Sequence, residues 1–103
     1  MYQIVLCTCP TIDVAESLAG SLVTAKLAAC VNIQPGVTSI YQWQGKIEKA
    51  QEYLLMIKTK AEYFEQVSRS ISEQHPYDVP EIVALDISQG NSDYLNWISD
   101  SLK

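Results

Sequence analysis

The feature that most constrains the fold is a pair of long strand-forming segments, residues 31–43 and 46–58, joined by only two residues, Gln44-Gly45. Both segments carry β-branched and aromatic residues, and a two-residue connection between such segments predicts a tight β-hairpin. This hairpin takes up more than a quarter of the 103 residues in the chain. The rest of the sequence therefore has to fold around it.

Two further strands are predicted outside the hairpin. Residues 2–7 form a short apolar run typical of a buried strand, and residues 79–87 predict a fourth strand. The first hairpin strand begins near residue 28 and is interrupted by Pro35-Gly36. Because proline cannot donate a ladder hydrogen bond, we expect a bulge or a bend there.

Helical patterns separate and follow these strands. The first helix has two candidate N-caps, Thr11 and Asp13, and the second has the capping-box pair Thr59 and Glu62. The second helix should end at Pro76, because a residue before proline is pushed out of the α region. The apolar stripes at helical spacing are Val14, Leu18 and Leu22, then Phe64, Val67 and Ile71, then Leu95, Ile98 and Leu102.

The predicted order of elements is strand, helix, strand, strand, helix, strand and a final helix. This is the split βαβ pattern of the ferredoxin-like fold, an α+β sandwich in which two right-handed crossovers place both helices on one face of an antiparallel sheet. In that topology the first strand lies in the middle, antiparallel to the third and fourth strands. Because the sequence contains no linker, repeat or low-complexity tract, we expect residues 1–103 to form a single domain.

The predicted hairpin is too long for the domain that carries it. Each strand spans about 43 Å at about 3.3 Å per residue, whereas a compact domain of this size is roughly 33 Å across. Its outer part holds Ile40, Tyr41, Trp43 and Ile47. Exposed edges with aromatic residues promote association, so we expect an obligate homo-oligomer. The alternative is that the bend at residue 35 folds the hairpin back onto its own domain.

Charge and composition exclude several classes of partner. The net charge is −5 and the seven basic residues are scattered, which argues against nucleic-acid binding. No segment approaches the roughly 20 apolar residues of a membrane span, and the N-terminal residues do not resemble a signal peptide. We therefore expect a cytoplasmic protein without a membrane partner. The odd number of cysteines, Cys7, Cys9 and Cys30, then predicts free thiols.

The only histidine, His75, lies in the proline-braced segment EQHPYDVPEI at residues 73–82. In the predicted topology this segment leads into the fourth strand at the same sheet edge where the first strand ends at Cys7. We therefore expect Cys7 and His75 to meet, although they lie far apart in the sequence. A thiolate and an imidazole can bind a soft metal ion or act as nucleophile and base.

Both residues also have a purely structural interpretation. A histidine near a helix C-terminus is stabilised by the helix dipole, and a buried cysteine at a strand end is common packing. Cys7 and Cys9 would share one face if the strand continued, but a C-x-C lacks the paired spacing of a zinc site. Asp78 and Glu81 are candidates to orient His75. No oxyanion donor is identifiable, so we do not expect an enzyme.

Four segments, taken in order, cover essentially the whole chain and resemble the CutA divalent-cation tolerance family, and in particular a bacterial member. The segments are AACVNIQPGVTSIYQWQGKIE at 28–48, IKT at 57–59, HPYDVPEI at 75–82 and DYLNWI at 93–98. The resemblance implies a ferredoxin-like fold assembled as a homotrimer through interlocking hairpins. It also implies binding of copper and other divalent metal ions, and a part in metal tolerance.

The resemblance further implies two metal ligands. These are the cysteine of the first strand, Cys7 in VLCT, and the histidine of HPY, His75. Some members carry two adjacent histidines before the proline, whereas this chain has Gln74 before His75. The departure removes one imidazole from the family's pattern.

The sequence therefore predicts a trimeric cytosolic protein that binds copper or another divalent metal ion through Cys7 and His75. The alternative is a PII-like trimeric signalling module that holds a small anionic molecule near Lys58, although no phosphate-binding loop is present. Acyl-phosphate hydrolysis, a third activity of this fold, would need an arginine after the first strand. The only arginine, Arg69, lies in the second predicted helix.

Overall fold

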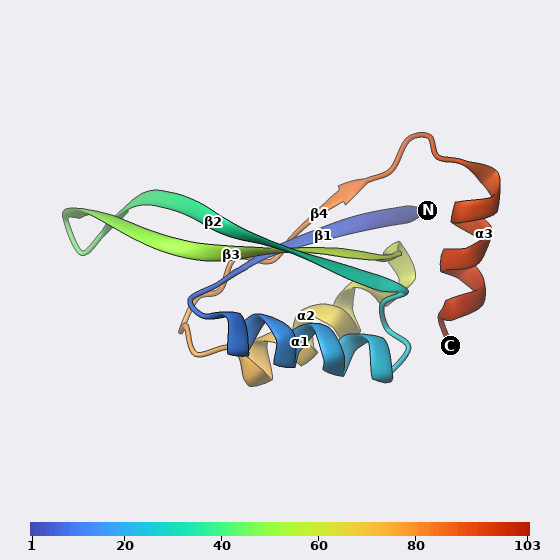
Figure 1. Ribbon diagram of the computed structural model, residues 1–103, viewed down its shortest axis with the longest axis horizontal. Coiled ribbons are helices and arrows are strands. Elements are labelled where there is room, and N and C mark those ends of the chain that lie inside the picture. The colour runs from blue at the N-terminus through green and yellow to red at the C-terminus, as the bar shows by residue number, and fades with distance from the viewer.

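The computed structural model describes residues 1–103 and contains one four-stranded antiparallel sheet (Figure 1). Its strands are β1 (Tyr2–Cys9), β2 (Cys30–Trp43), β3 (Lys46–Lys60) and β4 (Val83–Asp86). Their order in the sheet is β2-β3-β1-β4, with β1 antiparallel to both β3 and β4. The predicted α+β class and ferredoxin-like topology are confirmed.

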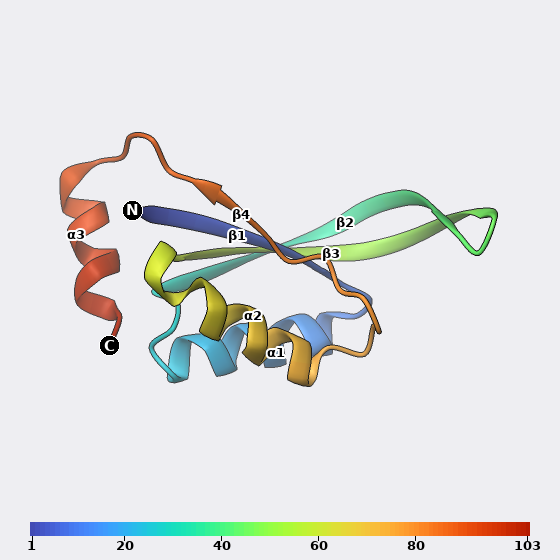
Figure 2. The same ribbon diagram turned by 180° about the vertical axis from the view of Figure 1, so that it is seen from behind.

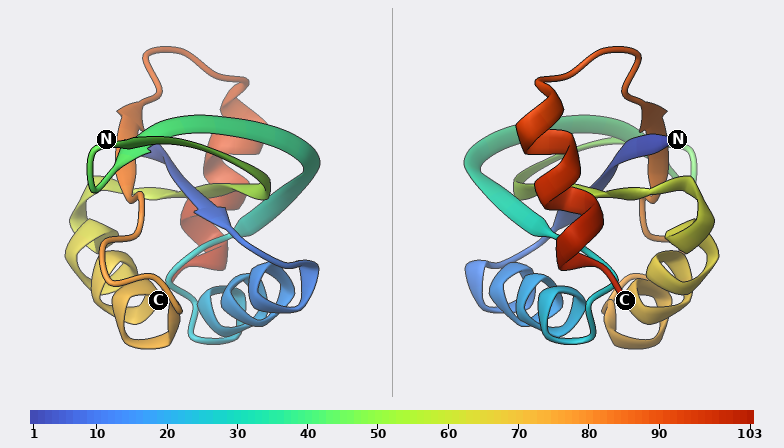
Figure 3. Two further views of the ribbon diagram at one scale, coloured as in Figure 1. Left: turned by 90° about the vertical axis from the view of Figure 1, so that its left-hand side faces the viewer. Right: turned by 90° about the vertical axis from the view of Figure 1, so that its right-hand side faces the viewer.

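The helices are α1 (Ile12–Thr24), α2 (Phe64–Gln74), preceded by the 3-10 turn η1 (Ala61–Tyr63), and α3 (Ser92–Ser101). Helices α1 and α2 lie together on one face of the sheet, as the front and back views show (Figures 1 and 2). Helix α3 crosses the end of the sheet opposite the hairpin tip (Figure 3). No helix combines the length and the apolar character that crossing a membrane requires.

The core fills the layer between the sheet and helices α1 and α2. Alternate residues of the central strands face the helices, because side chains in a strand point to opposite faces in turn. The apolar stripes predicted for α1 and α2 pack against these strand residues. The residues with at most 1% exposure in this layer are Val5, Cys7, Cys9, Ala15, Leu18, Leu22, Ala28, Leu55, Ile57, Val67 and Ile71.

The hairpin projects well beyond this core (Figure 1). Gln44 and Gly45 both have positive φ angles, 51° and 80°, as a type I′ hairpin turn requires. The predicted irregularity is present as a register shift between Gln34 and Val37, with Gly36 at a φ of 73°. The molecule measures 45 × 25 × 22 Å. The overhang is thus confirmed, and the alternative of a hairpin folded back onto its own domain is wrong.

The fourth strand is shorter than the sequence predicts. The sequence predicts a strand over residues 79–87, but β4 contains only Val83–Asp86. Pro80 has no N–H to donate to a ladder, and β4 pairs only with residues 3–6 of β1. The preceding residues, up to position 82, instead connect α2 to the sheet without regular structure.

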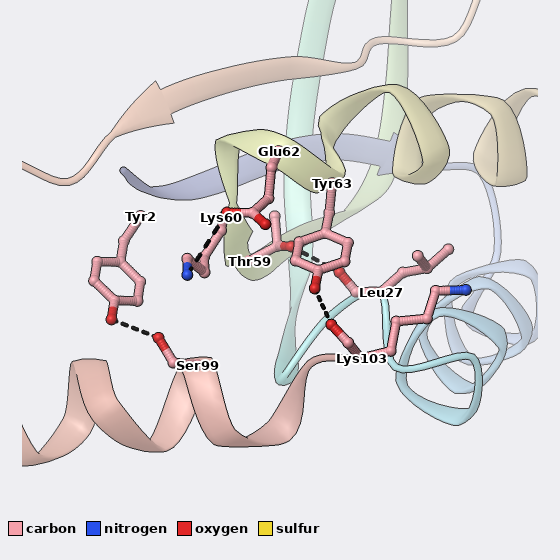
Figure 4. A network of polar contacts seen from close by, with 8 residues as sticks. All are labelled: Tyr2, Leu27, Thr59, Lys60, Glu62, Tyr63, Ser99 and Lys103. Atoms are coloured by element: carbon pink, nitrogen blue, oxygen red, sulfur yellow. Dashed lines mark hydrogen bonds and ion pairs between the residues drawn. The ribbon is translucent and has the colours of Figure 1, made fainter.

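The capping box predicted for Thr59 and Glu62 is wrong. Thr59 is fully buried, and its hydroxyl donates to the carbonyl oxygen of Leu27 at 2.7 Å (Figure 4). The reason is that β3 continues to Lys60, which places Thr59 at a position that faces the core. Of the two caps proposed for α1, Thr11 is the one observed, and its side chain accepts a hydrogen bond from the amide of Val14 at 3.2 Å.

Helix α3 is attached through its C-terminal half. The hydroxyls of Tyr2 and Ser99 lie 2.6 Å apart, and the hydroxyl of Tyr63 donates to the carbonyl oxygen of Lys103 (Figure 4). The side chain of Ile98 is fully buried. The Tyr2–Ser99 contact holds α3 against the start of β1, and the Tyr63–Lys103 contact holds the residue that follows α3 by two positions against η1.

Candidate metal centre

The candidate site lies where β1 ends and where α2 leads into the connection to β4. Because β1 continues through Cys9, Cys7 and Cys9 occupy the same face of the strand, and both are fully buried. His75 follows the last residue of α2 and is 8% exposed. The ligand atoms of Cys7, Cys9 and His75 all lie within 4.8 Å of one another. The topology therefore brings Cys7 and His75 together as expected, and adds Cys9.

The imidazole of His75 bridges two backbone segments. The amide of Tyr77 donates to Nδ1 at 3.1 Å, so Nδ1 is the acceptor and the ring proton is on Nε2. Nε2 then donates to the carbonyl oxygen of Thr8 at 2.8 Å. His75 also ends α2, with an extended backbone before Pro76. The ring therefore has a structural role, and its lone pair can bind a metal ion only if the Tyr77 amide releases Nδ1.

The two thiols differ in acidity. The hydrogen bond with Cys9, burial, and the negative charges of Cys9, Glu81 and Glu52 raise the pKa of Cys7 far above its ordinary value. The same hydrogen bond lowers the pKa of Cys9 against the opposing effect of burial. The carbonyl oxygen of Thr8, 3.7 Å from the Cys7 sulfur, is the alternative acceptor for the single proton of this thiol. Cys9 is therefore the first thiol of the pair to ionise.

A buried carboxylate lies beside this cluster. The hydroxyl of Tyr77 donates to Oε2 of Glu52 at 2.7 Å, and Glu52 is only 6% exposed. The Tyr77 and His75 rings are in contact, with centroids 4.7 Å apart. Tyr77 is 37% exposed, and its partial burial, the hydrogen bond to Glu52 and the charge of Glu52 together raise the pKa of its hydroxyl. Tyr77 thus contacts the imidazole through both its amide and its ring, while Glu52 holds its hydroxyl.

The prediction that Asp78 or Glu81 orients His75 is wrong. The partners of the ring nitrogens are the backbone groups of Thr8 and Tyr77. The role of Tyr77 was missed, although its place in HPY was a usable signal. Glu52 was also missed, since nothing in its local sequence distinguishes it from an exposed hairpin acid.

Gln74, which replaces a second histidine, points away from the cluster. Its amide nitrogen donates to the backbone and hydroxyl oxygens of Ser70, both at 3.1 Å, and its oxygen accepts from the hydroxyl of Ser21 at 3.1 Å. Gln74 therefore joins α2 to α1. Cys30 is half-buried and is not part of the cluster.

We expect Tyr77→Phe to lower the free energy of unfolding by about 1–2 kcal/mol, because the buried carboxylate of Glu52 loses its donor. The difference from the parent should shrink above about pH 10, the ordinary pKa of tyrosine. The raised pKa keeps the folded phenol neutral while the unfolded chain ionises, so this stabilisation is lost as the pH rises. Chemical denaturation at several pH values measures both effects. A difference from the parent that stays constant through alkaline pH would contradict the role of Tyr77.

The donor set fits a thiophilic metal ion. Thiolate and imidazole ligands suit copper and zinc. Ligand atoms that each lie about 2.0–2.3 Å from one ion are about 3.5–4 Å apart in a trigonal three-ligand arrangement. The ligand atoms of Cys7, Cys9 and His75, which lie within 4.8 Å of one another, therefore need to converge by at most about 1.3 Å.

Taken together, the fold and the site define a small ferredoxin-like α+β protein with a projecting hairpin and a buried thiol–imidazole cluster. Residues 3–101 match the family model described as CutA1 divalent ion tolerance protein. The chain belongs to this family.

Individual relatives agree with the family match. The chain is 48% identical over 101 residues to the divalent-cation tolerance protein CutA of Thermus thermophilus, covering 98% of each. It is 48% identical over 93 residues to the CutA homolog of Xenopus laevis, covering 90% of this chain and 62% of the frog protein. The solved structure of Cut A1 from Thermus thermophilus superimposes with a TM-score of 0.97 over all of both chains.

Proposed function

We propose that this protein is a cytosolic homotrimer, built from single-domain subunits, that binds copper or another divalent metal ion and takes part in divalent-cation tolerance. Cys7 and His75 are the proposed ligands, and no enzymatic activity is part of the proposal. The observation that carries it is the meeting of their ligand atoms within 4.8 Å. The names of the relatives, which describe divalent-cation tolerance, support the proposed role.

Metal binding at this site requires two local changes. The Cys7 thiol must lose its proton, and the Tyr77 amide must release Nδ1 of His75. A cation makes the first change favourable, because it compensates the charge that burial and the neighbouring carboxylates otherwise oppose. The second change lets Nε2–H keep its bond to the Thr8 carbonyl, the kind of backbone partner that commonly orients a metal-bound histidine.

The surface of a single subunit supports the proposed assembly. Ile40 and Ile47 lie on one face of the hairpin, and Tyr41 and Trp43 lie on the other. These side chains are 44–73% exposed. A projecting hairpin that is apolar on both faces needs partners on both sides, which neighbouring subunits in a ring can supply. The three free thiols support a cytosolic location, where thiols stay reduced.

The decisive experiment is metal titration of the purified full-length protein with Cu(I) under anaerobic conditions and with Cu(II) in air. We expect Cys7→Ser and His75→Ala each to weaken binding at least about tenfold, since each removes a ligand. Cys30→Ser is the matched control and should bind as the parent does. If both site variants bind as tightly as the parent, the assigned ligands are wrong.

No observation favours the PII-like alternative over metal binding. That alternative needs Lys58 free to meet an anionic molecule, but its ammonium group donates to the side-chain oxygen of Asn32 on β2. A thermal-shift screen with nucleotides and carboxylates tests it directly. If one of these compounds stabilises the parent protein but not Lys58→Gln, the PII-like alternative would be favoured over metal binding.

A further inference from the structure

We propose that Cys9 is a third metal ligand and that the Cys7–Cys9–His75 cluster selects Cu(I). This inference rests on the proposed function, because it assumes that Cys7 and His75 bind a metal ion. It goes further by naming an additional ligand and the oxidation state of the metal.

The placement of Cys9 is the first argument. β1 continues to Cys9, which pairs with Tyr53 of β3, so the backbone of both cysteines is held in the sheet. Residues two apart in a strand point to the same face, and the Cys9 sulfur accordingly lies in the same cluster as the other two ligand atoms. An ion that binds Cys7 and His75 is therefore within reach of Cys9 as well.

Burial is the second argument. Cys7 and Cys9 have no exposed surface, and His75 is 8% exposed. Water therefore has little access to complete a larger coordination shell. Zn²⁺ prefers four ligands and Cu²⁺ a tetragonal set of nitrogen and oxygen atoms, whereas soft thiolates select Cu(I). A solvent-shielded cluster of two sulfur atoms and one nitrogen atom matches Cu(I) in both ligand number and ligand type.

No Asp or Glu carboxylate belongs to the cluster of candidate ligand atoms. The carbonyl oxygen of Thr8 accepts from Nε2 of His75 and is the alternative acceptor for the Cys7 thiol. Oε2 of Glu52 accepts from the Tyr77 hydroxyl. When the Cys7 thiol is deprotonated, the Thr8 oxygen still accepts from Nε2 of His75, and Oε2 of Glu52 still accepts from the Tyr77 hydroxyl. The three-ligand set is therefore the simplest arrangement for an incoming ion.

The test loads the full-length protein anaerobically with one equivalent of Cu(I) per chain. X-ray absorption counts the sulfur ligands, and competition with a Cu(I)-specific chelator measures affinity. We expect two sulfur ligands in the parent and one in Cys9→Ala. Cys9→Ala should also weaken Cu(I) binding at least about tenfold, while Zn²⁺ and Cu²⁺ affinities change by less. Cys30→Ser is the matched control and should keep both sulfur ligands.

The outcomes separate this inference from the proposed function. One sulfur ligand in the parent, with binding lost in Cys7→Ser, would overturn the role of Cys9 and leave the proposed function standing. Unchanged binding in Cys7→Ser, His75→Ala and Cys9→Ala would overturn both. The sulfur count in the parent needs no substitution, so it decides the question even if a variant fails to fold.

Discussion

Replacing Ile40 and Ile47 together by aspartate is expected to split the proposed trimer into single subunits. The two side chains lie on the same face of the hairpin and are 70% and 73% exposed on one subunit. Burying each of them is worth about 1.5–3 kcal/mol. Losing the burial of both isoleucine side chains therefore weakens association by about 10²–10⁴-fold per subunit. Mass in solution should fall from about three chains to the 11.5 kDa of one chain.

The control for this variant adds the same charges elsewhere. Gln66 and Ser72 are exposed on α2, and Gln66→Asp with Ser72→Asp should leave the mass unchanged. Dissociation of this control would point to charge repulsion as the cause. A parent protein that is already monomeric would rule out the proposed assembly altogether.

Leu55→Ala is expected to lower the free energy of unfolding by about 2–5 kcal/mol, the usual range for deleting a fully buried leucine side chain. Leu55 has no exposed surface and lies in the middle of the sheet. Its neighbours across the strands are Cys7 on β1 and Ile33 on β2. The cavity left by the deleted leucine side chain would therefore lie directly beside the candidate metal centre. Denaturant unfolding at a fixed protein concentration measures the loss.

Val23→Ala is the matched control for the core variant. It also removes apolar atoms, but Val23 is 43% exposed on α1, so the cost should stay below about 1 kcal/mol. Equal losses in the two variants would mean that Leu55 is not a central part of the core.

Much of the fold could be predicted from local patterns. The turn at Gln44-Gly45, the irregularity near residue 35 and the order of elements all followed from residue type and spacing. The length of β4 did not, because pairing ends where β1 offers no further partner. The role of Thr59 was also hidden, since a capping box and a buried strand threonine look alike until the register of β3 is known.

The candidate site divides in the same way. The topology alone placed Cys7 beside His75, because antiparallel neighbours bring the end of one strand to the start of the next. It did not reveal that the His75 ring is held by backbone groups from two segments. Nor did it reveal the Glu52–Tyr77 pair. These are single contacts between distant segments, and no spacing rule encodes them.

The sequence by itself determined the class of fold, the projecting hairpin and the two proposed ligands, Cys7 and His75. These follow from periodicity and chain order, which are properties of short segments and of their succession. Only the tertiary structure decided that β1 extends to Cys9 and that the thiols of Cys7 and Cys9 are buried from solvent. It also decided that the lone pair of His75 is occupied by the amide of Tyr77. Burial and hydrogen-bond partners depend on how whole elements pack, and that packing is settled only when the chain is folded.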